Sequence, residues 1–257
     1  MIREGAAANC GAAATTPENF LLLFVSRRCG CMEVSVKNGC MHMDKEKLAA
    51  FITELVIREI KEIEKNEYTV PVGISARHVH LSQEHLEILF GKGYNLTCFK
   101  DLSQPGQFAA NEKVEIAGSK GSIKDVRILG PIRPHTQIEL SASEVRRLGI
   151  KAPVRASGDL EGTPGITLKG QAGEVYVSYG VIIAERHIHM SEEEAQKFKV
   201  KDKDVVNVIV EGAKGGMMSN VVIRAGKSHK LDFHVDTDDA NAFNLAQGQR
   251  LRIEKCQ

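Results

Sequence analysis

Two copies of a short histidine motif carry the chemistry that this sequence suggests first. His78 and His80 stand two residues apart in Arg-His-Val-His, and His187 and His189 stand two residues apart in Arg-His-Ile-His. In a β-strand, residues i and i+2 leave the same face, so each pair presents two imidazoles side by side. Imidazole is a common ligand of divalent transition metals, so each copy indicates part of a metal site.

The setting of the two copies is also repeated. Each pair follows an apolar, β-prone run and precedes a serine with acidic residues, which is a typical helix start, at Ser82 and Ser191. A single His-x-His is readily explained by a half-buried strand. A second copy about one domain length away favours two related units that each supply one pair to a shared site.

Further candidate ligands lie outside the repeat. His234 lies in Leu-Asp-Phe-His-Val-Asp, where strand alternation places it on one face with Asp232 and Asp236, and Glu139 lies in Gln-Ile-Glu-Leu. Five histidines and one carboxylate suit two adjacent metal ions, with zinc favoured and cobalt or manganese as substitutes. The remaining histidines lack such neighbours and are interpreted as surface or supporting residues: His42, His85, His135 and His229.

A local set of basic residues accompanies the histidines. Arg133 lies between Pro131 and Pro134, so its backbone is stiff and suited to aiming a guanidinium at a phosphate. Lys100 and Arg127 add positive charge. The alternative for each is an ordinary solvated surface cation.

The composition narrows the class of protein. The 257 residues carry 34 basic and 33 acidic side chains and no tryptophan, which argues against a broad nucleic-acid surface. Six cysteines, most of them in the first 40 residues, do not form a disulfide framework and fit a reducing compartment. The apolar run at 20–25 is too short to span a bilayer, so we expect a soluble intracellular protein.

The N-terminal part differs from the rest. Residues 1–43 lack periodicity, so we expect them to be irregular, either disordered or upstream of a physiological start at Met41 or Met43. Residues 44–65 carry apolar side chains at helical spacing, and a polar linker reaches residue 67. This amphipathic helix either packs on its own domain or docks into a partner's groove.

From residue 68 onward the pattern predicts a mainly β protein. Short β-prone runs alternate with Gly and Pro, including two longer strands at 69–81 and 173–184, and brief helices begin at Ser82, Ser141 and Ser191. The repeat places the domain break near Ala184. The expected architecture is two β-barrel domains, 68–184 and 185–257, capped by short α-helices.

Several motifs together resemble the phosphate propanoyltransferase family of propanediol-utilisation type. The resemblance covers residues 68–257 and lies in these segments: Ile74-Ser-Ala-Arg-His-Val-His-Leu81, Leu102-Ser-Gln-Pro-Gly-Gln-Phe-Ala-Ala110, Val126-Arg-Ile-Leu-Gly-Pro131, Ala152-Pro-Val-Arg155, Ser157-Gly158, Pro164-Gly-Ile-Thr-Leu168, Arg186-His-Ile-His-Met190 and His234-Val-Asp-Thr-Asp238.

The resemblance implies two β-barrel domains with a dinuclear zinc site between them. The matching positions imply the metal ligands His78, His80, Glu139, His187, His189 and His234, and Arg133 as the phosphate-binding residue. Five further positions match the coenzyme A pocket: Ser75, Lys100, Arg127, Leu129 and Asn241. In this family the strand before the first histidine pair packs with the second domain in some members, which affects the assignment of residues 68–75.

The implied reaction is reversible transfer of a propanoyl group between coenzyme A and inorganic phosphate. A phosphate oxygen is expected to attack the thioester carbonyl directly, without an acyl-enzyme. Two alternatives remain open: a two-metal hydrolase of thioesters or phosphoesters, and a metal-dependent scaffolding module.

The resemblance also bears on location and partners. Members housed in bacterial microcompartments carry an N-terminal amphipathic encapsulation helix, and residues 44–65 are similar to one. The expected location is the cytoplasm, within a microcompartment lumen, with shell or core proteins as partners of this helix. The family also suggests a homodimer or larger homo-oligomer.

Overall fold

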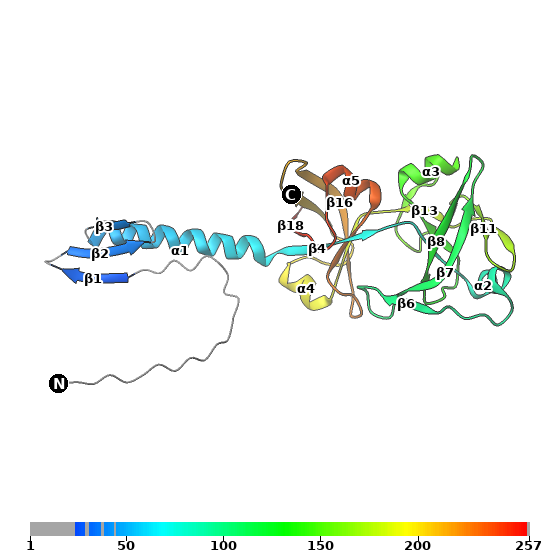
Figure 1. Cartoon of the computed structure of the whole chain (residues 1–257), viewed down its shortest axis with the longest axis horizontal. Helices are drawn as coiled ribbons and strands as arrows, with labels where there is room; N and C mark the ends of the chain where they lie inside the picture. Colours follow the sequence, from blue (N-terminus) through cyan, green and yellow to red (C-terminus); the bar gives the residue numbers. More distant parts are fainter. Residues whose placement is uncertain (1–23, 29–30, 37–38, 44, 256–257) are drawn as a thin grey trace, which may run out of the picture. The chain divides into compact units, whose positions relative to one another are not determined.

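The computed structural model describes residues 24–28, 31–36, 39–43 and 45–255. It divides into two compact units, Met1–Ile63 and Glu64–Gln257. Figure 1 colours the chain from blue at its N-terminus to red at its C-terminus. Each unit is described separately below.

The first unit contains a small sheet and most of a long helix. The strands β1 (Phe24–Arg28), β2 (Cys31–Val36) and β3 (Gly39–Met43) form an antiparallel sheet in the order β1-β2-β3. The sequence analysis expected irregular structure here, and the structure differs for these residues. The strands are only 5 or 6 residues long, too short for alternation to be recognised. Residues 1–23 lie outside the described residues.

The amphipathic helix expected at 44–65 is α1 (Lys45–Glu67). Leu48 is buried, whereas one group of larger apolar side chains stays exposed at 43–49%: Ile52, Val56, Ile57 and Ile60. At about 100° of rotation per residue, these four fall within an arc of about 140° on one side of the helix. The helix therefore presents an apolar stripe.

The second unit contains a closed barrel of strands in the order β14-β16-β15-β18-β4-β17. Their bounds are β4 (Thr69–Ser75), β14 (His187–Met190), β15 (Val205–Val210), β16 (Gly216–Ala225), β17 (Asp232–Asp236) and β18 (Arg250–Lys255). The helices α4 (Glu192–Lys197) and α5 (Thr237–Phe243) follow β14 and β17.

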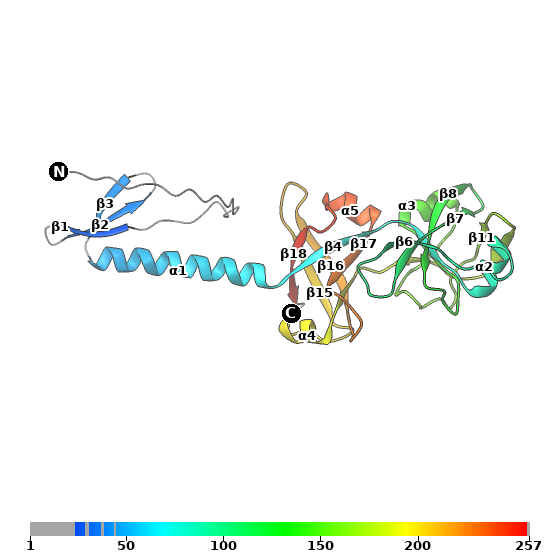
Figure 2. The same cartoon turned by 60° about the horizontal axis from the view of Figure 1, so that its bottom comes forward.

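Strand β4 does not lie with the domain to which the linear boundary assigned it. It pairs in parallel with β17 and antiparallel with β18, and Figures 1 and 2 both show it in cyan beside β18. The single strand expected at 69–81 is thus two strands, which belong to different sheets. Periodicity reports local burial only, so it does not reveal which sheet a strand joins.

The other part of this unit is a nine-stranded sheet that forms a half-barrel. Its strands are β5 (His78–His80), β6 (Cys98–Asp101), β7 (Phe108–Ala117), β8 (Ser122–Gly130), β9 (Gln137–Glu139), β10 (Val154–Arg155), β11 (Ile166–Lys169), β12 (Glu174–Val177) and β13 (Val181–Ala184). The strand expected at 173–184 is likewise split, into β12 and β13. Helices α2 (Gln83–Phe90) and α3 (Ala142–Leu148) complete it.

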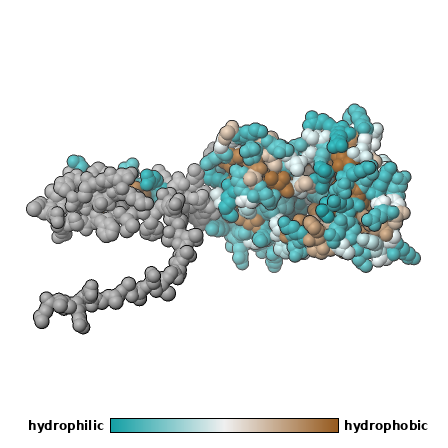
Figure 3. Space-filling view, in the orientation of Figure 1, coloured by the Kyte–Doolittle hydropathy of each residue, from teal (hydrophilic) through white to brown (hydrophobic). Residues whose placement is uncertain are grey.

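Each sheet encloses its own hydrophobic core. Val79, Ile128 and Ile138 are fully buried in the nine-stranded sheet, and Ile188 and Phe233 are fully buried in the closed barrel. The fold is therefore mainly β, as the sequence predicts. On the face shown in Figure 3, hydrophobic residues form separate small patches within a largely hydrophilic surface. Among the described residues, no helix combines the length and apolar composition that a bilayer crossing requires.

The two sheets meet where the histidine motifs lie. The chain leaves β13 at Ala184 and enters β14 at His187, and earlier it leaves β4 at Ser75 and enters β5 at His78. Both crossings lead directly into a His-x-His strand. The fold therefore brings the two copies of the repeat to the junction between the sheets.

Candidate metal and substrate site

A cavity of about 660 Å³ lies at this junction. Both sheets contribute to its lining, including His78 and Glu139 from the nine-stranded sheet and His187 and His234 from the closed barrel. The cavity is large enough for a small organic ligand. The candidate ligands that the sequence analysis selected from distant segments therefore surround one space.

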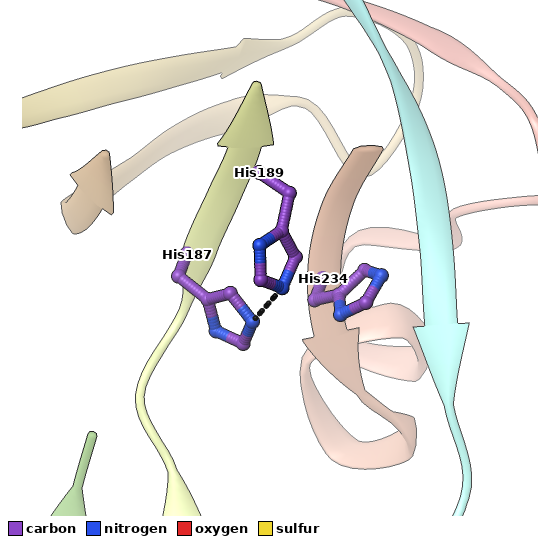
Figure 4. Close-up of side chains that lie close together, drawn as sticks. All are labelled: His187, His189 and His234. Atoms are coloured by element: carbon purple, nitrogen blue, oxygen red, sulfur yellow. Dashed lines mark hydrogen bonds between the residues drawn. The ribbon is translucent and has the colours of Figure 1, made fainter. Parts of the chain in front are cut away.

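The closed barrel supplies a cluster of three histidines. In the antiparallel pairing of β14 with β17, His187 lies opposite His234. The Nε2 atoms of His187 and His189 are 3.2 Å apart, and potential ligand atoms of all three residues lie within 4.8 Å of one another. Figure 4 shows the three rings turned toward one another. We call these residues the second half-site.

The nine-stranded sheet supplies an equivalent cluster. In the antiparallel pairing of β5 with β9, His78 lies opposite Glu139, and the Nε2 of His78 is 3.5 Å from an Oε2 of Glu139. His80 completes a group whose potential ligand atoms also lie within 4.8 Å of one another. We call these residues the first half-site. The two half-sites thus use the same strand arrangement.

Backbone carbonyls orient three of the rings. The Nδ1 atom of His78 lies 2.9 Å from the Ala76 carbonyl, that of His80 lies 3.2 Å from the Leu129 carbonyl, and that of His187 lies 2.8 Å from the Glu185 carbonyl. A proton on Nδ1 satisfies each carbonyl and leaves Nε2 with a free lone pair. Fixing the tautomer in this way is characteristic of metal-binding imidazoles.

Burial holds three of the imidazoles neutral: His80, His187 and His189. Burial, reinforced by neighbouring imidazoles, lowers the pKa of His187 to about 4 and that of His189 to about 2. In the first half-site, burial lowers the pKa of His80 to about 3. A neutral imidazole is the form that binds a metal ion, so protons do not compete strongly at these rings near neutral pH.

Glu139 alters the charge state of the first half-site. Burial alone would lower the pKa of His78, but the charge and hydrogen bond of Glu139 outweigh it and the pKa is raised. Burial would likewise raise the pKa of Glu139, but His78 outweighs it and holds this pKa well below the usual range. Glu139 is therefore an anionic ligand candidate beside two imidazoles.

The side chains present fit metal ions. The Nδ1 of His189 is buried and has no hydrogen-bond partner, although the ring lies among other imidazoles. Two three-residue groups of nitrogen and carboxylate donors each hold their potential ligand atoms within 4.8 Å of one another. Three protein ligands with open positions are the arrangement of catalytic zinc, and imidazole with carboxylate also suits other first-row metals.

Arg133 lies against the first half-site. One of its guanidinium nitrogens, Nη1, donates to the Ser157 hydroxyl at 3.3 Å, and that hydroxyl donates to Glu139 Oε1 at 3.1 Å. Burial lowers the pKa of Arg133, partly offset by Glu139, but a guanidinium remains charged at this position. The residue therefore presents a fixed positive charge to the cavity that it lines.

Four of the five residues matched to a coenzyme A pocket line this cavity: Ser75, Lys100, Arg127 and Leu129. Arg127 is fixed by a 2.8 Å hydrogen bond to the Ala110 carbonyl and lies 4.8 Å from the centre of the Phe99 ring. The fifth, Asn241, lies on α5 with an exposed side chain and is not part of the lining.

Some lining residues were not recognised from the sequence. His229, interpreted as a surface or supporting residue, lies with its ring centre 4.6 Å from that of His189. Arg224 and Ser103 also line the cavity. Asp232 was placed on the His234 face by alternation, but its partner Ser103 is far away in sequence. Only the pairing of distant segments brings these residues together.

Comparisons with known proteins show the family of this chain. Residues 71–246 match the family model described as phosphate propanoyltransferase. The chain is 52% identical to the phosphate propanoyltransferase of Thermotoga maritima, covering 77% of this chain and 94% of that protein. It is 46% identical to the enzyme of that name from Rhodobacter capsulatus, with 79% and 95% covered, and 47% identical to that from Clostridioides difficile, with 82% and 99% covered.

Proposed function

The chain belongs to the phosphate propanoyltransferase family, and on this premise we propose that it interconverts propanoyl-CoA and phosphate with propanoyl phosphate and CoA at a dinuclear zinc site. It is an acyltransferase. The observation that carries the proposal is the convergence of two half-sites and Arg133 on one cavity.

We assign His78, His80 and Glu139 to one zinc ion and His187, His189 and His234 to the other. Three rings that place Nδ1 against a backbone carbonyl and one low-pKa carboxylate support this assignment. When bound, the zinc ions supply positive charge that orients phosphate and stabilises the negative charge developing on the thioester oxygen.

Arg133 binds phosphate in this proposal. Its link to Ser157 fixes the guanidinium, and its remaining N–H groups are suited to paired hydrogen bonds with phosphate oxygens. Holding phosphate beside the thioester makes the attack effectively intramolecular. A bond forms from a phosphate oxygen to the carbonyl carbon, and the bond from that carbon to sulfur breaks, so CoA leaves as a thiolate.

Lys100 and Arg127 bind the phosphates of CoA, and Ser75 and Leu129 line its path. Both cations line the cavity, and the hydrogen bond of Arg127 to the Ala110 carbonyl fixes its direction. We assign Asn241 to the same role from its motif position only. Its exposed place on α5 puts it at most at the edge of the site.

Phosphate-dependent thiol release tests this function. We expect zinc-loaded protein to release CoA from propanoyl-CoA only when inorganic phosphate is present, with propanoyl phosphate as the second product. Equal release without phosphate would instead indicate a two-metal thioesterase. No release under either condition would leave the scaffolding interpretation.

We also propose that α1 directs the enzyme into a bacterial microcompartment, where it recycles CoA. The exposed stripe of Ile52, Val56 and Ile60 is suited to a groove in a shell or core protein. In cells that form compartments, Ile52→Asp/Val56→Asp protein should move from the compartment fraction to the cytosol and keep its activity. Unchanged fractionation would contradict this role. A homodimer or larger assembly is proposed as well, which light scattering of the full chain would test.

A further inference from the structure

Each half-site occupies one face of a two-strand ladder, and this face has four corners. In the first half-site, His78 lies opposite Glu139 and His80 lies opposite Gln137. In the second, His187 lies opposite His234 and His189 lies opposite Asp232. Three corners of each ladder are the assigned ligands. The fourth corners, Gln137 and Asp232, have no role in the function proposed above.

Asp232 is buried at the fourth corner of the second half-site and held there by hydrogen bonds. It is 5% exposed, its Oδ2 lies 3.0 Å from the Nε2 of His234, and the Ser103 hydroxyl donates to the same oxygen. A Cβ atom on Gly73 would lie 2.6 Å from Oδ1 of Asp232. A side chain at residue 73 would therefore displace the carboxylate, and glycine leaves the space that it needs.

Gln137 has an equivalent position in the first half-site. It is 1% exposed, and its amide donates to Glu139 and, at 2.7 Å, to the Ser157 hydroxyl. Its Oε1 accepts from the Gly158 backbone at 2.8 Å. Both fourth-corner residues thus contact the third candidate ligand of their own half-site, and a serine from another segment contacts each of them.

The two half-sites differ in where their carboxylate lies. The first has its carboxylate at a ligand corner, Glu139, and a neutral amide at the fourth. The second has the imidazole of His234 at the ligand corner and its carboxylate, Asp232, at the fourth. Each ladder face therefore carries one carboxylate beside its His-x-His pair, but the carboxylate occupies a different corner in each half-site.

His234 is also oriented differently from the other rings. His78, His80 and His187 place Nδ1 against a backbone carbonyl, whereas His234 places Nε2 against Asp232. An Nε2–H donated to this carboxylate leaves Nδ1 as the nitrogen with a free lone pair. The carboxylate therefore selects which nitrogen of His234 is available to a cation.

We propose that Asp232 is a positioning residue of the second half-site, which fixes the tautomer and direction of His234, supplies that half-site's negative charge, and is itself held by Ser103. This inference rests on the metal site of the proposed function. Ser103 belongs to the segment between β6 and β7, so the nine-stranded sheet anchors a half-site of the closed barrel.

A second contact strengthens this anchor. Gln104, 4% exposed, donates to the Lys230 carbonyl at 2.8 Å and accepts from the Lys230 backbone nitrogen at 3.2 Å. These paired bonds hold the segment of Ser103 next to the start of β17. The geometry at Asp232 therefore depends on both sheets being correctly joined.

The test measures metal affinity in the full-length protein. Zinc is titrated into metal-free protein against a chromophoric chelator, giving the number of ions bound and their Kd values. Hydrogen-bond partners of metal ligands typically contribute 10- to 100-fold to metal affinity. Asp232→Ala should raise the Kd of one of the two zinc ions by about that factor and leave the Kd of the other unchanged. Ser103→Ala should give a smaller loss at the same ion.

The substitution that removes the negative charge of Asp232 has a matched control. Asp232→Asn and Asp125→Asn make the same substitution, but the Asp125 side chain is 77% exposed and pairs with Lys113. Asp125→Asn protein should bind both ions with wild-type Kd values. Asp232→Asn protein should bind one of them with a raised Kd. Asparagine can still accept from His234, so its loss should be smaller than that of alanine.

Double variants assign the affected ion to a half-site. Asp232→Ala/His234→Ala should lose no more affinity than His234→Ala alone, because both changes act on one ion. Asp232→Ala/His80→Ala should weaken both ions. Two ions bound by Asp232→Ala with wild-type Kd values, or equal weakening of both ions, would overturn the inference. Failure of wild-type protein to bind two ions would instead contradict the proposed metal site.

Discussion

The two half-sites of this enzyme share one strand arrangement and differ in the corner that carries the carboxylate. Both are antiparallel strand pairs with a His-x-His strand, and both turn the same face to the cavity. Glu139 occupies in the first half-site the corner that His234 occupies in the second. The ladder is the same in both half-sites, but the carboxylate occupies a different corner in each, which changes what each half-site offers a ligand.

The exchange has a local consequence for the cavity. In the first half-site the carboxylate contacts His78 directly and is linked through Ser157 to Arg133. In the second the carboxylate contacts His234 and Ser103. Glu139 and Arg133, the proposed anionic ligand and the proposed phosphate-binding cation, therefore lie together on one side. We infer that phosphate is oriented mainly from the first half-site.

Removing a ligand from either half-site should have the largest effect. His80→Ala and His189→Ala should each lower kcat by about 10³-fold or more, because several kcal/mol of charge stabilisation depend on both ions and each 1.36 kcal/mol is tenfold. Each variant should retain one zinc ion per chain by elemental analysis. A variant that retained both ions and lost activity would show that its imidazole has another role.

Arg133 and Arg224 line the cavity from opposite sheets, so they test which side orients phosphate. Arg133→Ala should raise the KM for phosphate by about 10- to 100-fold, because hydrogen bonds to a charged group contribute about 1.5–3 kcal/mol. The Kd for CoA should change far less. Arg224→Ala should affect the phosphate KM less than Arg133→Ala does. Equal effects would mean that both half-sites orient phosphate.

Acidification should affect the metal-free protein through its buried imidazoles. The pKa values of His80, His187 and His189 are about 3, 4 and 2 in the folded protein, against about 6.5 when unfolded. Below pH 6.5 the unfolded chain binds more protons, so stability falls as pH decreases, by up to about 1.4 kcal/mol per pH unit for each imidazole.

His78 has the opposite effect on the pH dependence of stability, because its pKa in the folded protein is raised. Its stabilisation is fully present below the unfolded pKa and is lost as pH rises through the folded pKa. Thermal unfolding from pH 7 to pH 5 should therefore show a smaller loss of Tm in His189→Ala than in wild type, and a larger loss in His78→Ala. Identical pH profiles for both variants would contradict the opposite pKa shifts of His78 and His189.

The sequence predicts the contents of both half-sites better than their construction. The repeat, together with alternation around His234, brings five of the six ligand candidates into one hypothesis, because a two-residue spacing has a direct geometric meaning in a strand. Glu139 is a separate candidate from the segment Gln-Ile-Glu-Leu. Alternation also places Asp232 on the correct face. It does not reveal Ser103 as its partner, because that contact joins residues 129 positions apart.

The sequence likewise predicts the structural class of the fold but not the pairing of its distant strands. Mainly β structure with short capping helices follows from short apolar runs, Gly and Pro, and capping serines. The crossing of β4 into the closed barrel does not, since the sequence pattern predicts β4 and β5 as one strand at 69–81. Their separation depends on hydrogen bonds to β17, β18, β8 and β9, all distant in sequence.

The smallest expected effect concerns the CoA side of the cavity, away from both half-sites. Lys100 is an exposed residue on β6, and an exposed cation contributes little to binding each phosphate because solvent screens it. Lys100→Ala should therefore raise the KM for propanoyl-CoA by less than about tenfold and leave the phosphate KM unchanged. The increase should shrink at high salt. A raised phosphate KM would show that Lys100 acts with Arg133, so that cations beyond the half-sites help to orient phosphate.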